Sequence, residues 1–99
     1  MNNMPPKLRQ ELSEDPYYQI CARAGSDCHG RITFEHALTY VGRQIQERFA
    51  ILPLCEWHHL GNGLDKRWNI KMAMYRATPE DRKKYPNLEW KKFDASLSR

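Results

Sequence analysis

Apolar side chains recur along the chain in short groups that alternate with polar stretches. Leu8 and Leu12 are four residues apart and follow two prolines, so a helix is predicted over residues 5–14. The aromatic and apolar segment 17–22 is predicted to be extended. Residues 24–27 contain Gly and Asp and are predicted to form a turn, which folds the chain back on itself.

Two apolar groups in the middle of the chain have the length of strands. Residues 31–34 are predicted to form a short strand that ends at the Glu-His pair 35–36. Residues 49–52 are predicted to form a second strand, which Pro53 stops. The polar, glycine-containing stretch 37–48 is expected to be a loop that connects the two strands.

Helical spacing dominates the second half of the chain. Residues 55–60 are predicted to be helical up to the glycines that follow, and residues 64–77 to form a longer helix. A further helix is predicted to begin after Thr78, where proline takes the first helical position, and Asn87 is expected to cap a last one. The stripe of the longer helix that is expected to lie in the core consists of Leu64, Trp68, Met72 and Tyr75.

Length and composition indicate a single small domain. Its 99 residues are expected to form one domain, 1–99, with a marginal core, for which a structural metal is a common remedy. No apolar run approaches the roughly 20 residues that a bilayer requires, and residues 1–6 lack the apolar centre of a signal peptide. A cytoplasmic protein without a membrane partner is therefore expected.

Positive charge is concentrated towards the C-terminus. The net charge is +4, and residues 66–92 hold nine Lys or Arg against three acids. A basic surface of this kind suits a polyanion such as nucleic acid, although an ordinary solvated helix face gives the same count. Affinity for DNA should then fall steeply with salt. The residues expected to meet phosphates are Lys83, Lys84, Lys91 and Lys92.

Three cysteines and a histidine pair are spaced as ligands of one zinc ion. An odd number of cysteines fits a disulfide framework poorly, and structural zinc takes four thiolate or imidazole ligands. Cys55 and His58 are three apart at a predicted helix start, and the turn between Cys21 and Cys28 lets both thiolates point to one centre. Either His58 or His59 completes the set. The alternative is that the cysteines are buried thiols without a metal.

A second group of polar residues is predicted to lie beside the zinc site. If zinc takes the first histidine of the pair, His59 points elsewhere, because neighbours on a helix are about 100° apart. His59 and Asn62 then share one helix face, and Glu35 and His36 face that helix if the two strands form a hairpin. A carboxylate, two imidazoles and an amide would surround one pocket. The alternative partners of the Glu35 carboxylate are Arg31 and Arg43.

These motifs resemble those of the HNH endonucleases, also called ββα-metal or His-Me finger nucleases. The resemblance covers roughly residues 17–70, and the chain looks like the small phage or prophage versions. It implies an α+β fold with a small ββα-metal core, a structural zinc knot and flanking helices, followed by a basic helical part over 71–99. The residues that carry the resemblance are Cys21 and Cys28, the pair Glu35-His36, and Leu54-Cys55-x-x-His58-His59 in place of the common Leu-Cys-x-x-Cys-His.

The resemblance also implies a role for each residue of the pocket. His36 matches the general base that takes a proton from the attacking water. Glu35 and His59 match the ligands of a single divalent ion, magnesium or manganese, that stabilises the leaving oxygen. The implied activity is that of a DNA endonuclease or nickase that hydrolyses phosphodiester bonds, with DNA as the partner and no small-molecule substrate.

Two positions depart from the family pattern. Ala50 stands where the family has the asparagine that ties down the loop carrying the base, and Gly63 stands where the family often has a further histidine ligand. Asn62, Asp65 or water would fill the second gap.

Two other functions fit the same sequence. The first is a catalytically inactive, zinc-stabilised nucleic-acid-binding module. The second is a protein-interaction adaptor in which Trp57, Trp68 and Trp90 are partly exposed.

Overall fold

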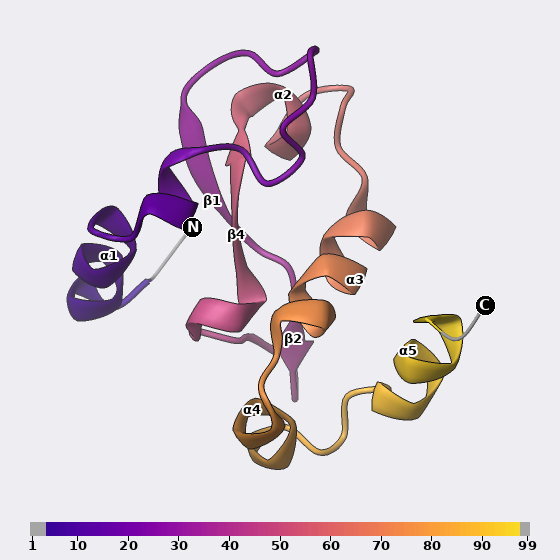
Figure 1. The fold of residues 1–99 in the computed structure, drawn as a ribbon. Coiled ribbons are helices and arrows are strands. Elements are labelled where there is room, and N and C mark those ends of the chain that lie inside the picture. Colours follow the sequence, from indigo (N-terminus) through magenta and orange to yellow (C-terminus); the bar gives the residue numbers. More distant parts are fainter. Residues whose placement is uncertain (1–3, 98–99) are drawn as a thin grey trace.

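A two-stranded antiparallel sheet lies at the centre of the structure, a computed structural model that describes residues 4–97 (Figure 1). Strand β1 (Ile32–His36) pairs with β4 (Ile51–Cys55), and Glu35 lies opposite Leu52. The α+β class predicted from the sequence is confirmed, in the form of short helices around small antiparallel sheets. Within the described residues, no helix has the length and apolar character needed to cross a membrane.

The remaining elements are short. Helix α2 follows β4 directly and is followed by α3, the longest helix, while a small hairpin, β2–β3, interrupts the segment between β1 and β4. The bounds are α1 (Pro6–Ser13), the 3₁₀ helices η1 (Pro16–Gln19) and η2 (Arg48–Ala50), β2 (Thr39–Tyr40), β3 (Arg43–Gln44), α2 (Glu56–His59), α3 (Lys66–Arg76), α4 (Pro79–Lys84) and α5 (Trp90–Leu97).

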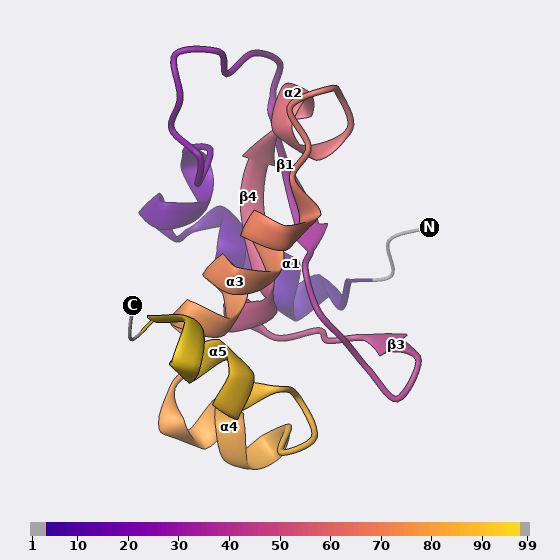
Figure 2. The same ribbon diagram turned by 90° about the vertical axis from the view of Figure 1, so that its right-hand side faces the viewer.

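The central sheet separates two layers of the core. Figures 1 and 2 show α1 on one face of β1 and β4 and α3 on the other. Because side chains alternate along a strand, Phe34 and Ile51 pack on the α1 side with Leu12 and Tyr18. On the α3 side, Leu52 and Leu54 pack with Trp68 and Met72. A third cluster of buried apolar side chains lies between α3, α5 and η2. This arrangement places Glu35, which alternates with Phe34, on the α3 side.

The second strand differs from its predicted bounds of 49–52. It runs over Ile51–Cys55 and passes through Pro53, which was expected to stop it. The carbonyl of Pro53 accepts a hydrogen bond from the backbone N–H of Ala22 at 2.7 Å, on the side of β4 away from β1. The missing N–H of the proline also lies on that outer side, so the β1–β4 ladder loses no hydrogen bond.

The core-facing stripe predicted for the longer helix is only half right. Trp68 and Met72 pack against the sheet, but Tyr75 is 67% exposed and Leu64, which precedes the helix, is 37% exposed. The side chains that α3 buries are instead Asn69, Ala73 and Met74. Since α3 contacts both the sheet and the third cluster, its buried face is wider than one stripe and includes a polar residue.

Three smaller predictions are also wrong. Residues 17–22 are not wholly extended, because Asp15 accepts a hydrogen bond from the N–H of Tyr17 and starts the 3₁₀ helix η1. The stretch 37–48 is not a simple loop, since Val41 and Gly42, both with positive φ, turn β2 into β3. The last helix begins at Trp90 rather than directly after Asn87. By contrast, the helix expected over 5–14 and the cap at Thr78 are confirmed.

Candidate functional site

Three cysteines and one histidine converge at the end of the central sheet. Cys55 ends β4, His58 follows one turn later on α2, and the loop before β1 carries Cys21 and Cys28 to the same point. The ligand atoms of these four side chains all lie within 4.8 Å of one another. His58, rather than His59, therefore belongs to the cluster.

The chemistry and spacing of this cluster fit a tetrahedral metal ion. The Nδ1 atom of His58 lies 3.2 Å from the sulfur of Cys55, 3.4 Å from that of Cys21 and 3.5 Å from that of Cys28. In a tetrahedral zinc site, nitrogen and sulfur ligands are about 3.6 Å apart, as bond lengths of about 2.0 and 2.3 Å require. The four side chains can therefore hold a metal ion such as zinc.

The pKa values of the thiols differ, because ionisation of one thiol makes ionisation of its neighbour less favourable. Burial and the neighbouring thiol of Cys21 raise the pKa of Cys28 to about 11. At Cys55, burial opposes ionisation, but the backbone amides of His58 and His29 outweigh it and lower the pKa to about 6. Adjacent thiolates repel one another, and the positive charge of a bound cation offsets that repulsion. Thiolates are also the form of cysteine that binds a metal.

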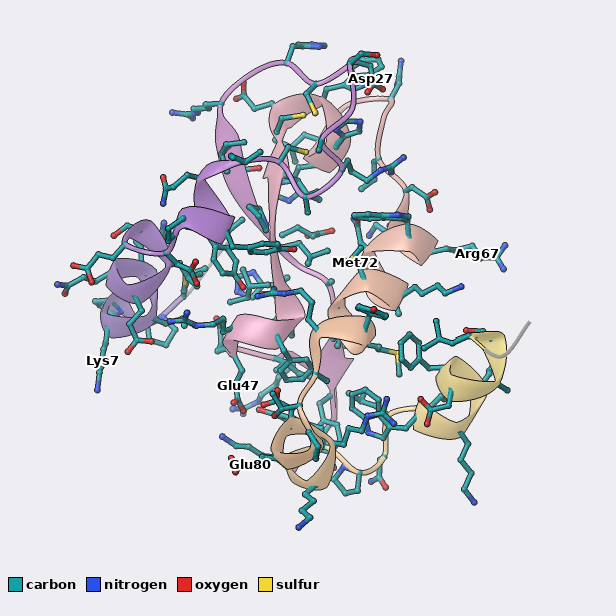
Figure 3. The ribbon with its side chains drawn as sticks, in the orientation of Figure 1. Lys7, Asp27, Glu47, Arg67, Met72 and Glu80 are labelled. Atoms are coloured by element: carbon teal, nitrogen blue, oxygen red, sulfur yellow. The ribbon has the colours of Figure 1, made fainter. Side chains whose placement is uncertain are left out.

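A carboxylate completes the surroundings of the cluster. Asp27, labelled in Figure 3, lies on the loop between the two N-terminal cysteines and approaches the Nε2 atom of His58 to 3.3 Å. Its second oxygen accepts a hydrogen bond from the indole of Trp57. A carboxylate behind a ligating histidine fixes the tautomer that leaves Nδ1 free for a metal. Asp27 was not predicted as part of the site, although its place beside Cys28 was a usable signal.

Glu35 and His59 meet beside this cluster, on the α3 side of the sheet. The Nε2 atom of His59 lies 3.4 Å from Oε1 of Glu35, and both side chains are about four-fifths buried. Burial alone would raise the pKa of Glu35, but the proximity of His59 and the charge of Lys66 hold it below its ordinary value. The alternative pairing of Glu35 with Arg31 is wrong, because Arg31 pairs with Glu56.

Thr33 sets the tautomer of His59. Its hydroxyl donates its one proton to the carbonyl of Leu54 at 2.8 Å, so Oγ1 can only accept from Nδ1 of His59, 2.6 Å away. In a neutral imidazole the proton is then on Nδ1, and the lone pair of Nε2 faces the carboxylate of Glu35. Two acceptors at this distance repel each other unless a cation or a second proton lies with them.

His36 is among the residues that line a pocket beside Glu35, but it alternates with Glu35 along β1, and its imidazole contacts a different partner. Its Nε2 atom contacts Oε1 of Gln46 at 2.9 Å. An amide oxygen only accepts, so Nε2 carries the proton and Nδ1 is left as the basic atom of the ring. Gln46 lies in the stretch between the strands that was expected to be a simple loop, and nothing in its spacing identified it.

The pocket beside Glu35 and His36 has a volume of about 320 Å³ and contains one buried amide, and His59 adjoins it through its contact with Glu35 rather than lining it. Asn69 of α3 is 2% exposed and lines this pocket with Glu35, His36 and Lys66. Asn69 lies near enough to Glu35 to favour its ionised form, yet neither amide atom reaches a protein partner at hydrogen-bonding geometry. An unpaired buried amide is costly, so it is suited to a ligand in the pocket.

Neither residue expected to compensate at the Gly63 gap lines the pocket in this structure. Asn62 is exposed in the turn after α2 and, like His59, is not among the lining residues. Asp65 caps α3 by accepting a hydrogen bond from the N–H of Trp68. A Cβ atom at Gly63 would lie 2.5 Å from the indole nitrogen of Trp57 and 2.9 Å from the His58 ring, so no side chain fits there.

The three tryptophans have partners within the chain. The indole of Trp57 donates to Asp27, Arg23 stacks over Trp68, and Trp90 is 9% exposed and donates to the carbonyl of Tyr85. The exposure of Trp90 that the adaptor hypothesis required is therefore not found.

No protein-family model, curated protein or solved structure matches the chain. The function is therefore inferred from the residues themselves.

Proposed function

We propose that the protein is a metal-dependent endonuclease that hydrolyses phosphodiester bonds in DNA, with β1, β4 and α2 as a ββα-metal core. The observation that carries this proposal is the 3.4 Å approach of the Glu35 carboxylate to the lone-pair nitrogen of His59, beside a separate Cys/His cluster. The cluster would hold structural zinc, and the pocket would perform the chemistry.

Glu35 and His59 would hold the divalent ion. Neighbouring ligands of an octahedral magnesium ion are about 3 Å apart, which is close to the distance found here. Thr33 orients the imidazole so that Nε2 faces the carboxylate. A bound magnesium or manganese ion would supply a Lewis acid that stabilises the leaving oxygen of the phosphodiester.

His36 would act as the general base. Its Nε2–H is engaged by Gln46, so the free Nδ1 can take a proton from the attacking water. Gln46 would thus supply an anchor for the base although Ala50 stands at the asparagine position of the HNH family. Lys66 and the unpaired amide of Asn69 border the same pocket, where they would bind phosphate oxygens.

The test is relaxation of supercoiled plasmid with magnesium or manganese. Wild type should nick the plasmid, and His36→Ala should lower the rate at least about a hundredfold, the usual contribution of a general base. His29→Ala is the matched control, because His29 is exposed and lies outside the pocket. All three proteins should contain stoichiometric zinc.

Two outcomes would contradict the proposal. Equal nicking by wild type and His36→Ala would mean that His36 is not the base. Binding of DNA without nicking by zinc-loaded wild type would identify the inactive binding module instead.

A further inference from the structure

We propose that the groove between α3 and α5 holds the nucleic-acid strand that continues from the pocket beside Glu35 and His36. This inference rests on the proposed function and names the surface that binds its substrate. The groove has a volume of about 370 Å³. Its floor and rim are formed chiefly by Arg67, Ile70, Lys71, Met74, Lys92 and Phe93.

The groove continues from the candidate site along one helix. Ile70 lines both the groove and the pocket that contains Glu35, and Lys66 lies at the pocket end of α3. From Lys66 to Met74 the helix rises about 12 Å. In a duplex this corresponds to about three to four nucleotides of one strand at 3.4 Å each. A strand with its scissile phosphate in the pocket would therefore reach the groove within a few nucleotides.

The cations at the groove are available to a polyanion. Within residues 4–97, neither Arg67 nor Lys71 forms an ion pair, and Figure 3 shows Arg67 extending away from the body of the protein. Lys92 approaches Glu89 only to 3.9 Å, and both side chains are more than three-quarters exposed. A pair of this kind is weak in water.

Two of the three basic residues of α4 are paired with acids of the protein itself. Lys84 pairs with Glu47 at 2.8 Å, and Arg82 donates two hydrogen bonds of 2.9 Å to Asp94. These contacts within the protein neutralise much of the charge of α4. The α3–α5 groove is thus the better phosphate-binding surface, although all four lysines of the last two helices were expected to meet phosphates.

The shape of the groove also suits a nucleic-acid strand. Its floor is apolar, with Ile70 43% exposed and Met74 and Phe93 almost buried, and its rim is cationic. Sugars and base faces can lie on the apolar floor while phosphates meet the rim. Together with its continuity with the pocket, this combination favours nucleic acid over an acidic peptide.

The first experiment measures binding of a short fluorescein-labelled duplex by anisotropy at several salt concentrations, without added divalent ion. The groove variant is Arg67→Ala/Lys71→Ala. The charge-matched control is Lys7→Ala/Arg9→Ala, which removes an exposed lysine and an exposed arginine from α1. The groove variant should bind more weakly, and its slope of log affinity against log salt should fall by about 0.9 for each lost phosphate contact. The control should keep the wild-type slope.

A second pair of variants tests for increased affinity, which loss of the fold could not produce. Glu89→Gln removes the acid at the groove and should raise affinity about twofold, whereas Glu80→Gln on α4 should change nothing. Equal effects of the groove and control variants would overturn the proposal. Tighter binding of a polyglutamate peptide than of the duplex would identify a protein-binding groove and would also overturn it.

Plasmid nicking separates this inference from the proposed function. If wild type nicks and the groove variant binds DNA as wild type does, only the groove assignment fails. If wild type neither binds nor nicks DNA, both proposals fail.

Discussion

The Cys/His cluster and the neighbouring site of Glu35, His59 and the adjoining pocket are built in different ways. In the cluster, the polar atoms of Cys21, Cys28 and His58 chiefly face one another, and the loop that carries the first two cysteines has little regular structure. In the pocket, Thr33 and Gln46 hold the imidazoles through hydrogen bonds that the fold itself supplies. The cluster should therefore depend on a metal to form, whereas the arrangement of Glu35 and the two imidazoles should not depend on a second, divalent ion once the protein is folded.

The largest expected effect is on folding, and it should follow a substitution in the Cys/His cluster but not one at Glu35. Cys55→Ser should remove one zinc ligand and unfold the protein, because metal-binding energy on the order of 10 kcal/mol is comparable to the whole stability of a domain. Glu35→Gln should leave the fold and the zinc content unchanged but abolish nicking. Circular dichroism and metal analysis of both variants, with and without a chelator, measure this. A folded, zinc-free Cys55→Ser protein would contradict the comparison.

An intermediate effect is expected at Asp27. Asp27→Ala removes the carboxylate behind His58 and should weaken zinc binding about tenfold, at the lower end for outer-shell partners because Asp27 is 61% exposed. Competition with a chromogenic chelator measures the affinity. Glu14→Gln, at an exposed acid directly after α1, should not change it. An unchanged affinity in Asp27→Ala would show that the cluster needs only its four ligands.

The smallest effect should come from the anchor of the proposed base. Gln46→Ala should lower the nicking rate up to about tenfold, because His36 keeps its chemistry and loses only its orientation. The substrate concentration at half-maximal rate should not change. Gln44→Ala, at an exposed residue of β3, is the matched control. If the control also loses rate, or if Gln46→Ala nicks as fast as wild type, Gln46 is not the anchor of His36.

Local rules predicted the parts of the site that are close in sequence. Cys55 and His58 converge because they lie on either side of one helix start, and His59 points away because a helix turns by about 100° for each residue. The cap at Thr78 follows from Thr-Pro and a following acid, and both hydrogen bonds of its capping box form.

Residues whose role depends on tertiary packing were not predictable in this way. Asn69 resembles any polar residue of a helix, and only the packing of α3 against the sheet makes it a buried member of the pocket. Gln46 is brought to His36 by the β2–β3 turn at Val41 and Gly42, where a β-branched residue takes an unusual positive φ. Pro53 was expected to end a strand, because the sequence does not show which side of a strand is paired. In the structure, the missing N–H of Pro53 lies on the side of β4 away from β1, where it costs no hydrogen bond to β1.

The position of Pro53 in β4 has a consequence for solubility. A sheet of two strands has two open edges, and each can recruit a strand from another molecule. On the outer edge of β4, Pro53 offers no N–H group, and its carbonyl already accepts from Ala22. That edge therefore cannot template regular pairing with a neighbouring chain. The same proline that the sheet tolerates would thus protect a small, marginally stable domain from aggregation.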